Sequence, residues 1–156
     1  MHKIHISFDT KDWIKNYNNI EKIIRNILKK SIMSEKKFLS KNVEISVLLT
    51  SSKKMIILNH KFRKKKKDTD ILSFPNEKPN FYRKKLKKKN IYLGDLALSF
   101  NYIKKQKIEF EEYLKKMLIH GFLHLIGYDH NNEKNYLKME KVQNKILKLV
   151  WVKKKI

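Results

Sequence analysis

The stretch His120-Gly-Phe-Leu-His124-Leu-Ile-Gly127-Tyr-Asp-His130 contains three of the six histidines in the 156-residue chain. His120 and His124 are four residues apart, so on a helix their rings project from one face, one turn apart. Gly127 suits the left-handed residue that commonly ends a helix. The turn that follows can fold His130 back toward the other two rings. Three converging imidazoles, with a fourth position left to water, are typical of a catalytic zinc site.

The alternative is that these histidines are ordinary hydrogen-bonded core residues. Residues 117–126 are apolar apart from His120, Gly121 and His124, which predicts a buried helix segment. A buried imidazole pair without partners would cost a few kcal/mol per group, whereas a shared metal satisfies both rings. We therefore predict that His120, His124 and His130 hold one Zn²⁺ ion per chain.

The spacing is also similar to a zinc-protease pattern, H-E-x-x-H-x-x-G-x-x-H. The three histidines and Gly127 match it, but Gly121 stands at the position of the glutamate. In those proteases the carboxylate takes a proton from zinc-bound water, so Gly121 argues against peptide hydrolysis by this route. A metal held here would still lower the pKa of a bound water to about 7 and polarise an oxygen.

Length and composition predict a single domain over residues 1–156. No apolar run approaches the roughly 18 residues that a membrane-spanning helix requires, so no membrane association is expected. The chain has no cysteine, and residues 1–8 lack the apolar block of a signal peptide. We therefore expect a cytoplasmic protein.

The charge balance is strongly basic, with 38 basic against 15 acidic residues and a formal net charge of +23. Such a balance favours polyanions, such as nucleic acid or an anionic membrane surface. However, 35 of the 38 basic residues are lysines, although phosphate recognition favours the arginine fork. The lysine excess agrees equally well with drift in an A+T-rich coding sequence. The charge is compatible with RNA binding without establishing it.

Apolar periodicity predicts four strands interleaved with helices. We expect strands over residues 3–8, 43–50, 70–75 and 91–100, and helices over residues 18–33, 52–63, 101–106, 109–127 and 133–151. Gly94 indicates a bulge or a close approach within the last strand. Residues 76–90 directly follow Pro75 and contain Pro79 and a run of lysines, and we expect a mobile loop there, a candidate substrate flap. The order of the elements predicts an α+β (α/β-like) fold, in which a small four-stranded mixed sheet packs with about five helices and the metal site lies at the end of a buried helix.

Residues 120–130 resemble the signature of the YbeY family of bacterial metal-dependent endoribonucleases. Three further segments match that family in its order, namely Leu58-Asn59-His60-Lys61-Phe62-Arg63, Thr69-Asp70-Ile-Leu-Ser-Phe-Pro75 and Leu93-Gly94-Asp95. Together the motifs cover the chain from about residue 58 to residue 130. The sequence departs from the family pattern in its overall basicity and in the lysines between Arg63 and Thr69.

The resemblance implies a small mixed sheet surrounded by helices, Zn²⁺ on the three histidines, and Arg63 near the metal cleft. It also implies cytoplasmic work on ribosomal RNA, with ribosomal RNA and ribosomal subunits as partners. Neither DNA nor a membrane is expected as a partner, and the oligomeric state stays open. We thus expect a single-strand-specific, zinc-dependent endoribonuclease that acts in late-stage ribosomal RNA maturation and ribosome quality control.

Arg63 is the residue that we expect to act on the phosphate. Phosphodiester cleavage develops charge on non-bridging oxygens, which a guanidinium can hold in a fixed fork; the alternative is a solvent-exposed residue at a helix end. Asp70 and Asp95 each have two open roles, either to orient a ligating imidazole or to form an ion pair or cap. Asp129 is expected to be a turn residue rather than a ligand, and His60 is expected to face solvent.

Two other functions remain open at this point. One is a zinc hydrolase that acts on a peptide or an ester. The other is a non-catalytic ribosome assembly factor whose metal is structural. A closed fourth coordination position would favour the structural metal, and an open one would favour catalysis.

Overall fold

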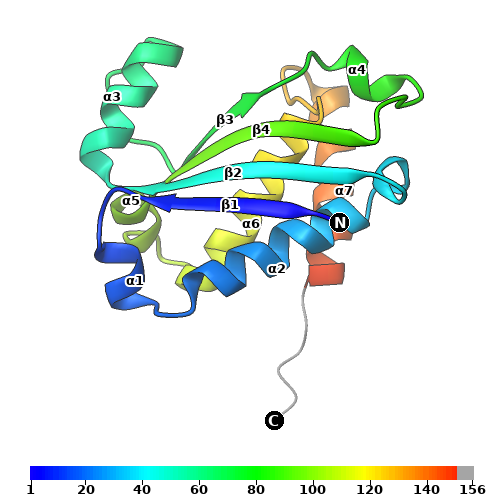
Figure 1. Ribbon diagram of the computed structural model, residues 1–156. Coiled ribbons are helices and arrows are strands. Elements are labelled where there is room, and N and C mark those ends of the chain that lie inside the picture. Colours follow the sequence, from blue (N-terminus) through cyan, green and yellow to red (C-terminus); the bar gives the residue numbers. More distant parts are fainter. Residues whose placement is uncertain (151–156) are drawn as a thin grey trace.

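The computed structural model describes residues 1–150 and contains one four-stranded sheet in that range (Figure 1). The strands are β1 (Lys3–Phe8), β2 (Asn42–Thr50), β3 (Ile71–Pro75) and β4 (Asn90–Ser99). Their spatial order is β1-β2-β4-β3, in which β1, β2 and β4 run parallel and β3 runs antiparallel to β4. The predicted α+β class and mixed sheet are confirmed.

Seven α-helices and one 3₁₀ helix accompany the sheet over the same residues. They are α1 (Asp12–Asn16), α2 (Ile20–Met33), η1 (Lys36–Phe38), α3 (Ser52–Arg63), α4 (Asn80–Arg83), α5 (Phe100–Lys104), α6 (Phe110–Leu125) and α7 (Glu133–Val150). The sequence pattern does not predict α1, η1 and α4, because elements of one turn or so leave no periodicity to detect. The predicted end of the last helix at residue 151 lies outside the described residues. The prediction of a single domain covers residues 1–156, a longer range than the described residues, and it stays a prediction.

The main core lies between the sheet and the helices α2, α6 and α7; Figure 1 draws α2 below the sheet and α6 and α7 behind it. Strand β2 turns every second side chain into this layer, and these residues are fully buried: Val43, Ile45, Val47 and Leu49. Helix α6 contacts β3, β4, α2 and α7 and is buried along most of its length. At its start the Glu109 carboxylate accepts hydrogen bonds from the backbone N–H groups of Glu111 and Glu112, both at 3.2 Å. Packing and capping therefore fix α6 firmly in the layer.

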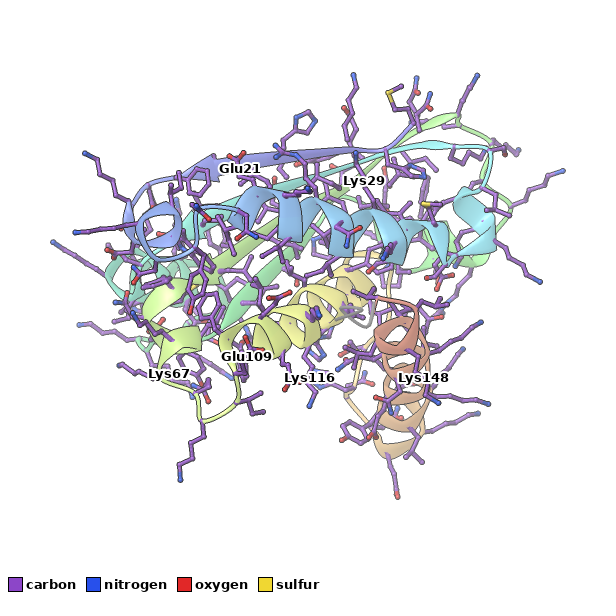
Figure 2. All side chains as sticks on the ribbon, turned by 90° about the horizontal axis from the view of Figure 1, so that it is seen from below. Glu21, Lys29, Lys67, Glu109, Lys116 and Lys148 are labelled. Atoms are coloured by element: carbon purple, nitrogen blue, oxygen red, sulfur yellow. The ribbon has the colours of Figure 1, made fainter. Side chains whose placement is uncertain are left out.

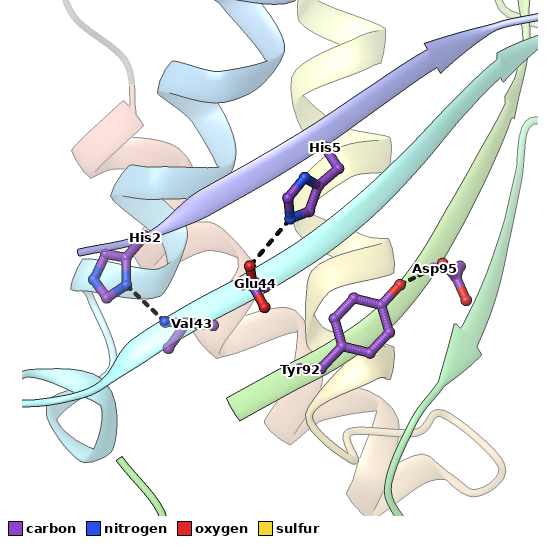
Figure 3. Close-up of polar contacts among 6 residues, drawn as sticks. All are labelled: His2, His5, Val43, Glu44, Tyr92 and Asp95. Carbon is purple, nitrogen blue, oxygen red and sulfur yellow. Dashed lines mark hydrogen bonds and ion pairs between the residues drawn. The ribbon is translucent and has the colours of Figure 1, made fainter. Parts of the chain in front are cut away.

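The opposite face of the sheet is covered only in part. Helix α3 packs there through Met55, which contacts Leu72 and Ala97. Farther along the same face the side chains are polar and pair with one another, within β4 and between β1 and β2 (Figure 3). Tyr92 donates a hydrogen bond to Asp95 at 2.5 Å, and a second pair joins residues of β1 and β2. Asp95 therefore lies on the face of the sheet that the main helical layer does not cover.

Basic side chains extend outward around the molecule, as Figure 2 shows for labelled residues such as Lys29, Lys116 and Lys148. The tract over residues 64–67 is exposed throughout, in agreement with the solvated loop that its composition indicates. Among residues 1–150, none of the helices combines the length and the apolar character that crossing a bilayer requires.

The segment over residues 76–90 differs from the expected loop. It contains α4, and two of its side chains, Tyr82 and Leu86, are buried in the main core. The prediction of a loop is therefore wrong at residues 80–83. The reason is compositional, because the two buried anchors lie among lysines and asparagines that lower the mean hydropathy of the whole segment.

Gly94 brings β3 and β4 together at one end of the sheet. One extra residue, Leu93, interrupts the register between β2 and β4, and Gly94 itself has φ +134°. A Cβ at this position would clash with the backbone oxygen of Phe74 and would lie 3.0 Å from the backbone nitrogen of Asn76. The predicted bulge and close approach are both present.

Replacement of this glycine tests the close approach. Gly94→Ala should lower the free energy of unfolding by about 3 kcal/mol, since both the positive φ and the backbone neighbours resist a Cβ. Gly121→Ala is the comparison, because a Cβ there would meet side-chain tips, Ile71 Cδ1 at 2.6 Å and Leu96 Cδ2 at 2.9 Å, which move at lower cost. Chemical denaturation measures both variants. An equal or larger loss for Gly121→Ala would contradict this account.

Candidate metal centre

The three predicted ligands meet at the end of α6. His120 and His124 lie in the last two turns of the helix, and His130 follows the turn after it. The Nε2 atoms of His120 and His124 are 3.0 Å apart. One ring nitrogen from each of the three histidines lies within 4.8 Å of the others. The cluster could therefore hold a metal ion with only small movements of the rings.

The end of α6 has the hydrogen bonds of a Schellman motif. The N–H of Gly127 donates to the oxygen of His124 at 3.1 Å, and the N–H of Tyr128 donates to the oxygen of Leu123 at 3.0 Å. Gly127 has φ +99°, and a Cβ there would lie 2.9 Å from Pro79 Cα. Both the backbone conformation and the packing of Pro79 thus require glycine, which confirms the predicted helix end.

The turn then places His130 against the first two rings. Asp129 accepts a hydrogen bond from the backbone N–H of His130 at 2.7 Å, so it is the turn residue that the sequence indicates. The His130 ring stacks on the His120 ring with centroids 5.4 Å apart and lies 5.0 Å from the His124 ring. The histidine cluster therefore depends on local structure over only eleven residues.

A residue from α7 orients the first histidine. The Gln143 side-chain oxygen lies 3.1 Å from Nδ1 of His120. Because an amide oxygen can only accept, Nδ1 carries the proton, and Nε2 keeps its lone pair toward the cluster. Sequence reasoning did not find Gln143, since no pattern relates a residue in the last helix to one 23 positions earlier.

Burial keeps the two helix histidines uncharged. It lowers the pKa of His124 to about 4, with further contributions from the charges of His120 and His130. Burial also lowers the pKa of His120, and the hydrogen bond with Gln143 opposes that effect only in part. A metal binds neutral imidazole. At neutral pH both donors are thus already in the form that a metal requires.

The histidines line a cleft of about 540 Å³, which Arg63 and several residues of β3 also line. Arg63 is the last residue of α3 and is exposed. Within residues 1–150 its guanidinium makes no hydrogen bond or ion pair. The fold thus brings Arg63 to the same cleft as the histidine cluster and leaves its nitrogens available to a ligand.

The similarity to known proteins identifies the family. The family model described as "Endoribonuclease YbeY" matches residues 5–150. The chain belongs to the endoribonuclease YbeY family. A protein of that name from Pelagibacter ubique (strain HTCC1062) is 37% identical, over 98% of this chain and 99% of its own length. Another, from Persephonella marina (strain DSM 14350 / EX-H1), is 43% identical over 67% of this chain and 69% of its own.

A solved structure extends the comparison to three dimensions. The solution structure of a protein from Thermotoga maritima is 28% identical, with a TM-score of 0.56, and the match covers 96% of this chain and 89% of that one. The resemblance seen between residues 58 and 130 is therefore confirmed, and YbeY-family similarity extends over nearly the whole chain.

Gly121 explains why the YbeY-family cleft lacks the protease glutamate. A Cβ at this position would lie 2.6 Å from Ile71 Cδ1 and 3.2 Å from Ser73 Oγ. The Ser73 hydroxyl donates to the backbone oxygen of Gly121 at 3.4 Å. Side chains of β3 therefore pack against the helix at Gly121 and leave no space for a carboxylate side chain unless they move.

Neither aspartate considered as an orienting group makes a hydrogen bond to a histidine ring. Asp70 lines the cleft, but it accepts hydrogen bonds from the Tyr113 hydroxyl at 2.8 Å and the Ile71 backbone N–H at 2.7 Å. Asp95 pairs with Tyr92 on the other face of the sheet. Asp70 and Asp95 therefore form hydrogen bonds with neighbouring groups, and the residue that orients a histidine ring is Gln143.

Metal affinity should depend on the Gln143 contact. Gln143→Leu should weaken metal binding about 10- to 100-fold while the fold persists, because His120 loses the group that fixes its protonated nitrogen. Competition with a chromogenic chelator measures the affinity, with His120→Ala as the reference for full loss. Asn144→Leu, an exposed change on the same helix, is the matched control. A Gln143→Leu affinity equal to that of the control would exclude the orienting role.

Acid should destabilise the metal-free protein through His124. Its pKa in the fold, about 4, lies below the ordinary value of 6.5, so the unfolded chain binds the proton more tightly. Stability is thus complete above about pH 6.5 and is lost as the pH falls toward 4. The melting temperature of chelator-treated protein should fall more steeply over this range in wild type than in His124→Gln. Parallel curves for the two proteins would refute the expected titration.

Proposed function

We propose that the chain is a zinc-dependent, single-strand-specific endoribonuclease that acts on ribosomal RNA during late-stage maturation and ribosome quality control, in the cytoplasm. One observation carries this proposal. In a chain of the endoribonuclease YbeY family, a single cleft is lined by Arg63 and by the three clustered histidines. That combination suits the cleavage of a phosphodiester.

The donor set supports zinc as the metal. Three imidazoles within 4.8 Å of one another, two of them kept neutral by burial, match the ligands that Zn²⁺ prefers. When bound, the metal would supply Lewis-acid activation of water and of the phosphate. Within residues 1–150 no fourth histidine or carboxylate joins the cluster, which favours an open, catalytic position over a closed, structural one.

Arg63 would bind the scissile phosphate. Its guanidinium can hold two non-bridging oxygens in the bidentate fork that a lysine ammonium cannot reproduce. Because no group in residues 1–150 pairs with it, no ion pair has to break before the substrate binds. The preorganised charge then stabilises the negative charge that develops during cleavage.

The size of the cleft and the surface charge support single-stranded RNA as the substrate. A cleft of about 540 Å³ has the dimensions of a small-ligand site, so it can receive one flexible strand more readily than a rigid duplex. The net charge of +23 attracts polyanions from a distance. Ribosomal RNA and ribosomal subunits are accordingly the proposed partners, and DNA is not expected.

The other two functions have weaker support. Hydrolysis of a peptide through a glutamate base lacks both the residue and the space, since Gly121 lies against β3. A purely structural metal has no need of a cleft or of an unpaired Arg63 beside it. No observation on the described residues favours either alternative.

Substitution of Arg63 separates a ribonuclease from these alternatives. Arg63→Ala should lower cleavage of single-stranded RNA by about 10²- to 10³-fold, with metal content and melting temperature unchanged. Arg63→Lys should recover only part of the loss. Arg25→Ala is the matched control, since Arg25 pairs with Glu21 on α2 at 3.3 Å. Equal rates for all four proteins at equal metal content would remove Arg63 from the site.

A further inference from the structure

A second cleft, of about 370 Å³, adjoins the histidine cleft. The two share a wall formed by Pro79, Gly127, Tyr128 and Asp129. The rest of the second cleft comes from η1, from Ile126 after α6, from α4 and from the start of α7. None of these residues has a role in the cleavage proposed above.

Three cations from three separate elements line this second cleft. They are Lys37 of η1, Arg83 of α4 and Lys138 of α7, and Asp129 is the one acidic side chain among the lining residues. Lys37 is held in place, since its ammonium donates to the backbone oxygen of Tyr82 at 3.3 Å. Arg83 donates to Asn80 through one nitrogen at 3.2 Å, which leaves other N–H groups for a ligand. The cleft therefore favours an anion.

Tyr82 lines this cleft without offering its hydroxyl to a ligand. The residue is 4% exposed, and the hydroxyl oxygen is itself buried and makes no hydrogen bond within the described part of the chain. The Tyr82 side chain packs in the main core, and its backbone oxygen holds Lys37 beside the cleft. Recognition of an anion here therefore depends on the three cations.

We propose that the second cleft is a phosphate subsite, which binds a phosphodiester of the RNA strand near the one cleaved at the histidines. This inference rests on the proposed function. Lys37, Arg83 and Lys138 donate to the non-bridging oxygens, and the strand passes along the shared wall from one cleft to the other. A phosphate is negatively charged and accepts several hydrogen bonds at once. It therefore suits three cationic donors better than the uncharged edge of a nucleobase does.

The arginines support this assignment against the background of lysines. The chain has only three arginines: Arg63 lines the histidine cleft, Arg83 lines the second cleft, and Arg25 is paired with Glu21. Lysines, in contrast, lie on elements far apart in the fold, as the labelled Lys29, Lys67, Lys116 and Lys148 show (Figure 2). Both clefts thus have the cation that is best suited to phosphate.

The test removes one cation. Arg83→Gln should leave the melting temperature nearly unchanged, because Arg83 is exposed and loses only its contact with Asn80. It should weaken binding of a fluorescent single-stranded oligoribonucleotide about 10-fold, as expected for loss of a hydrogen bond to a charged group. Fluorescence anisotropy on chelator-treated protein measures this affinity without cleavage. Arg25→Gln, which removes the same charge from the arginine paired with Glu21 on α2, is the matched control and should weaken binding far less.

A double-mutant cycle then identifies the phosphate. A set of oligoribonucleotides, each with one phosphate replaced by an uncharged methylphosphonate, is titrated against wild type and Arg83→Gln. At one position, the methylphosphonate should weaken binding to wild type about 10-fold and weaken binding to Arg83→Gln much less. The reason is that the methylphosphonate and the substitution of Arg83 remove the same contact. Additive losses at every position would overturn the subsite.

The remaining outcomes also decide the proposal. Equal affinity of Arg83→Gln and Arg25→Gln would show that Arg83 contributes only general charge and would overturn the subsite. If wild type binds the oligoribonucleotide but never cleaves RNA, the proposed function fails, and the Arg83→Gln affinity still decides the subsite. If wild type does not bind it at all, both proposals fail.

Discussion

The contact between Gly121 and β3 is the constraint on which the rest of the site depends. Because residue 121 has no side chain, the backbone of α6 lies directly on the strand, with Ser73 bonded to it. This close approach brings His120 and His124 to the same cleft as β3 and Arg63. A methyl group at this position would displace only side-chain tips, whereas a large side chain would separate helix and strand and would widen the cleft beside the histidines.

The parts of the site that could be predicted are those set by local geometry. The helical repeat places His120 and His124 on one face, and the turn after Gly127 brings His130 back to them. Both features are encoded within eleven residues. Strands and long helices were predicted for the same reason, since apolar periodicity is local. The position of Arg63 near the histidines was predicted only from the family resemblance, because the residues are far apart along the chain. Gln143 had no local signal at all.

Composition concealed other features. The segment over residues 76–90 has the appearance of an unstructured lysine-rich loop, yet Tyr82 and Leu86 anchor it in the core. Two buried side chains are enough to position a segment when they enter an existing core, whatever the polarity of their neighbours. The same excess of lysine makes the long-range attraction of RNA unselective, so selection of a particular phosphate has to come from the clefts and from their arginines.

The order of the elements along the chain has a consequence for biosynthesis. The cleft needs β3 and β4 from the middle of the chain, the ligands at the end of α6, and Gln143 from α7, the last element described. A ribosome releases these segments in sequence, and domains generally fold as units during synthesis. A nascent chain therefore lacks the oriented His120 until α7 has emerged. The proposed ribonuclease therefore completes its site late relative to its sheet, and a nascent chain that ends before α7 would hold a metal less tightly.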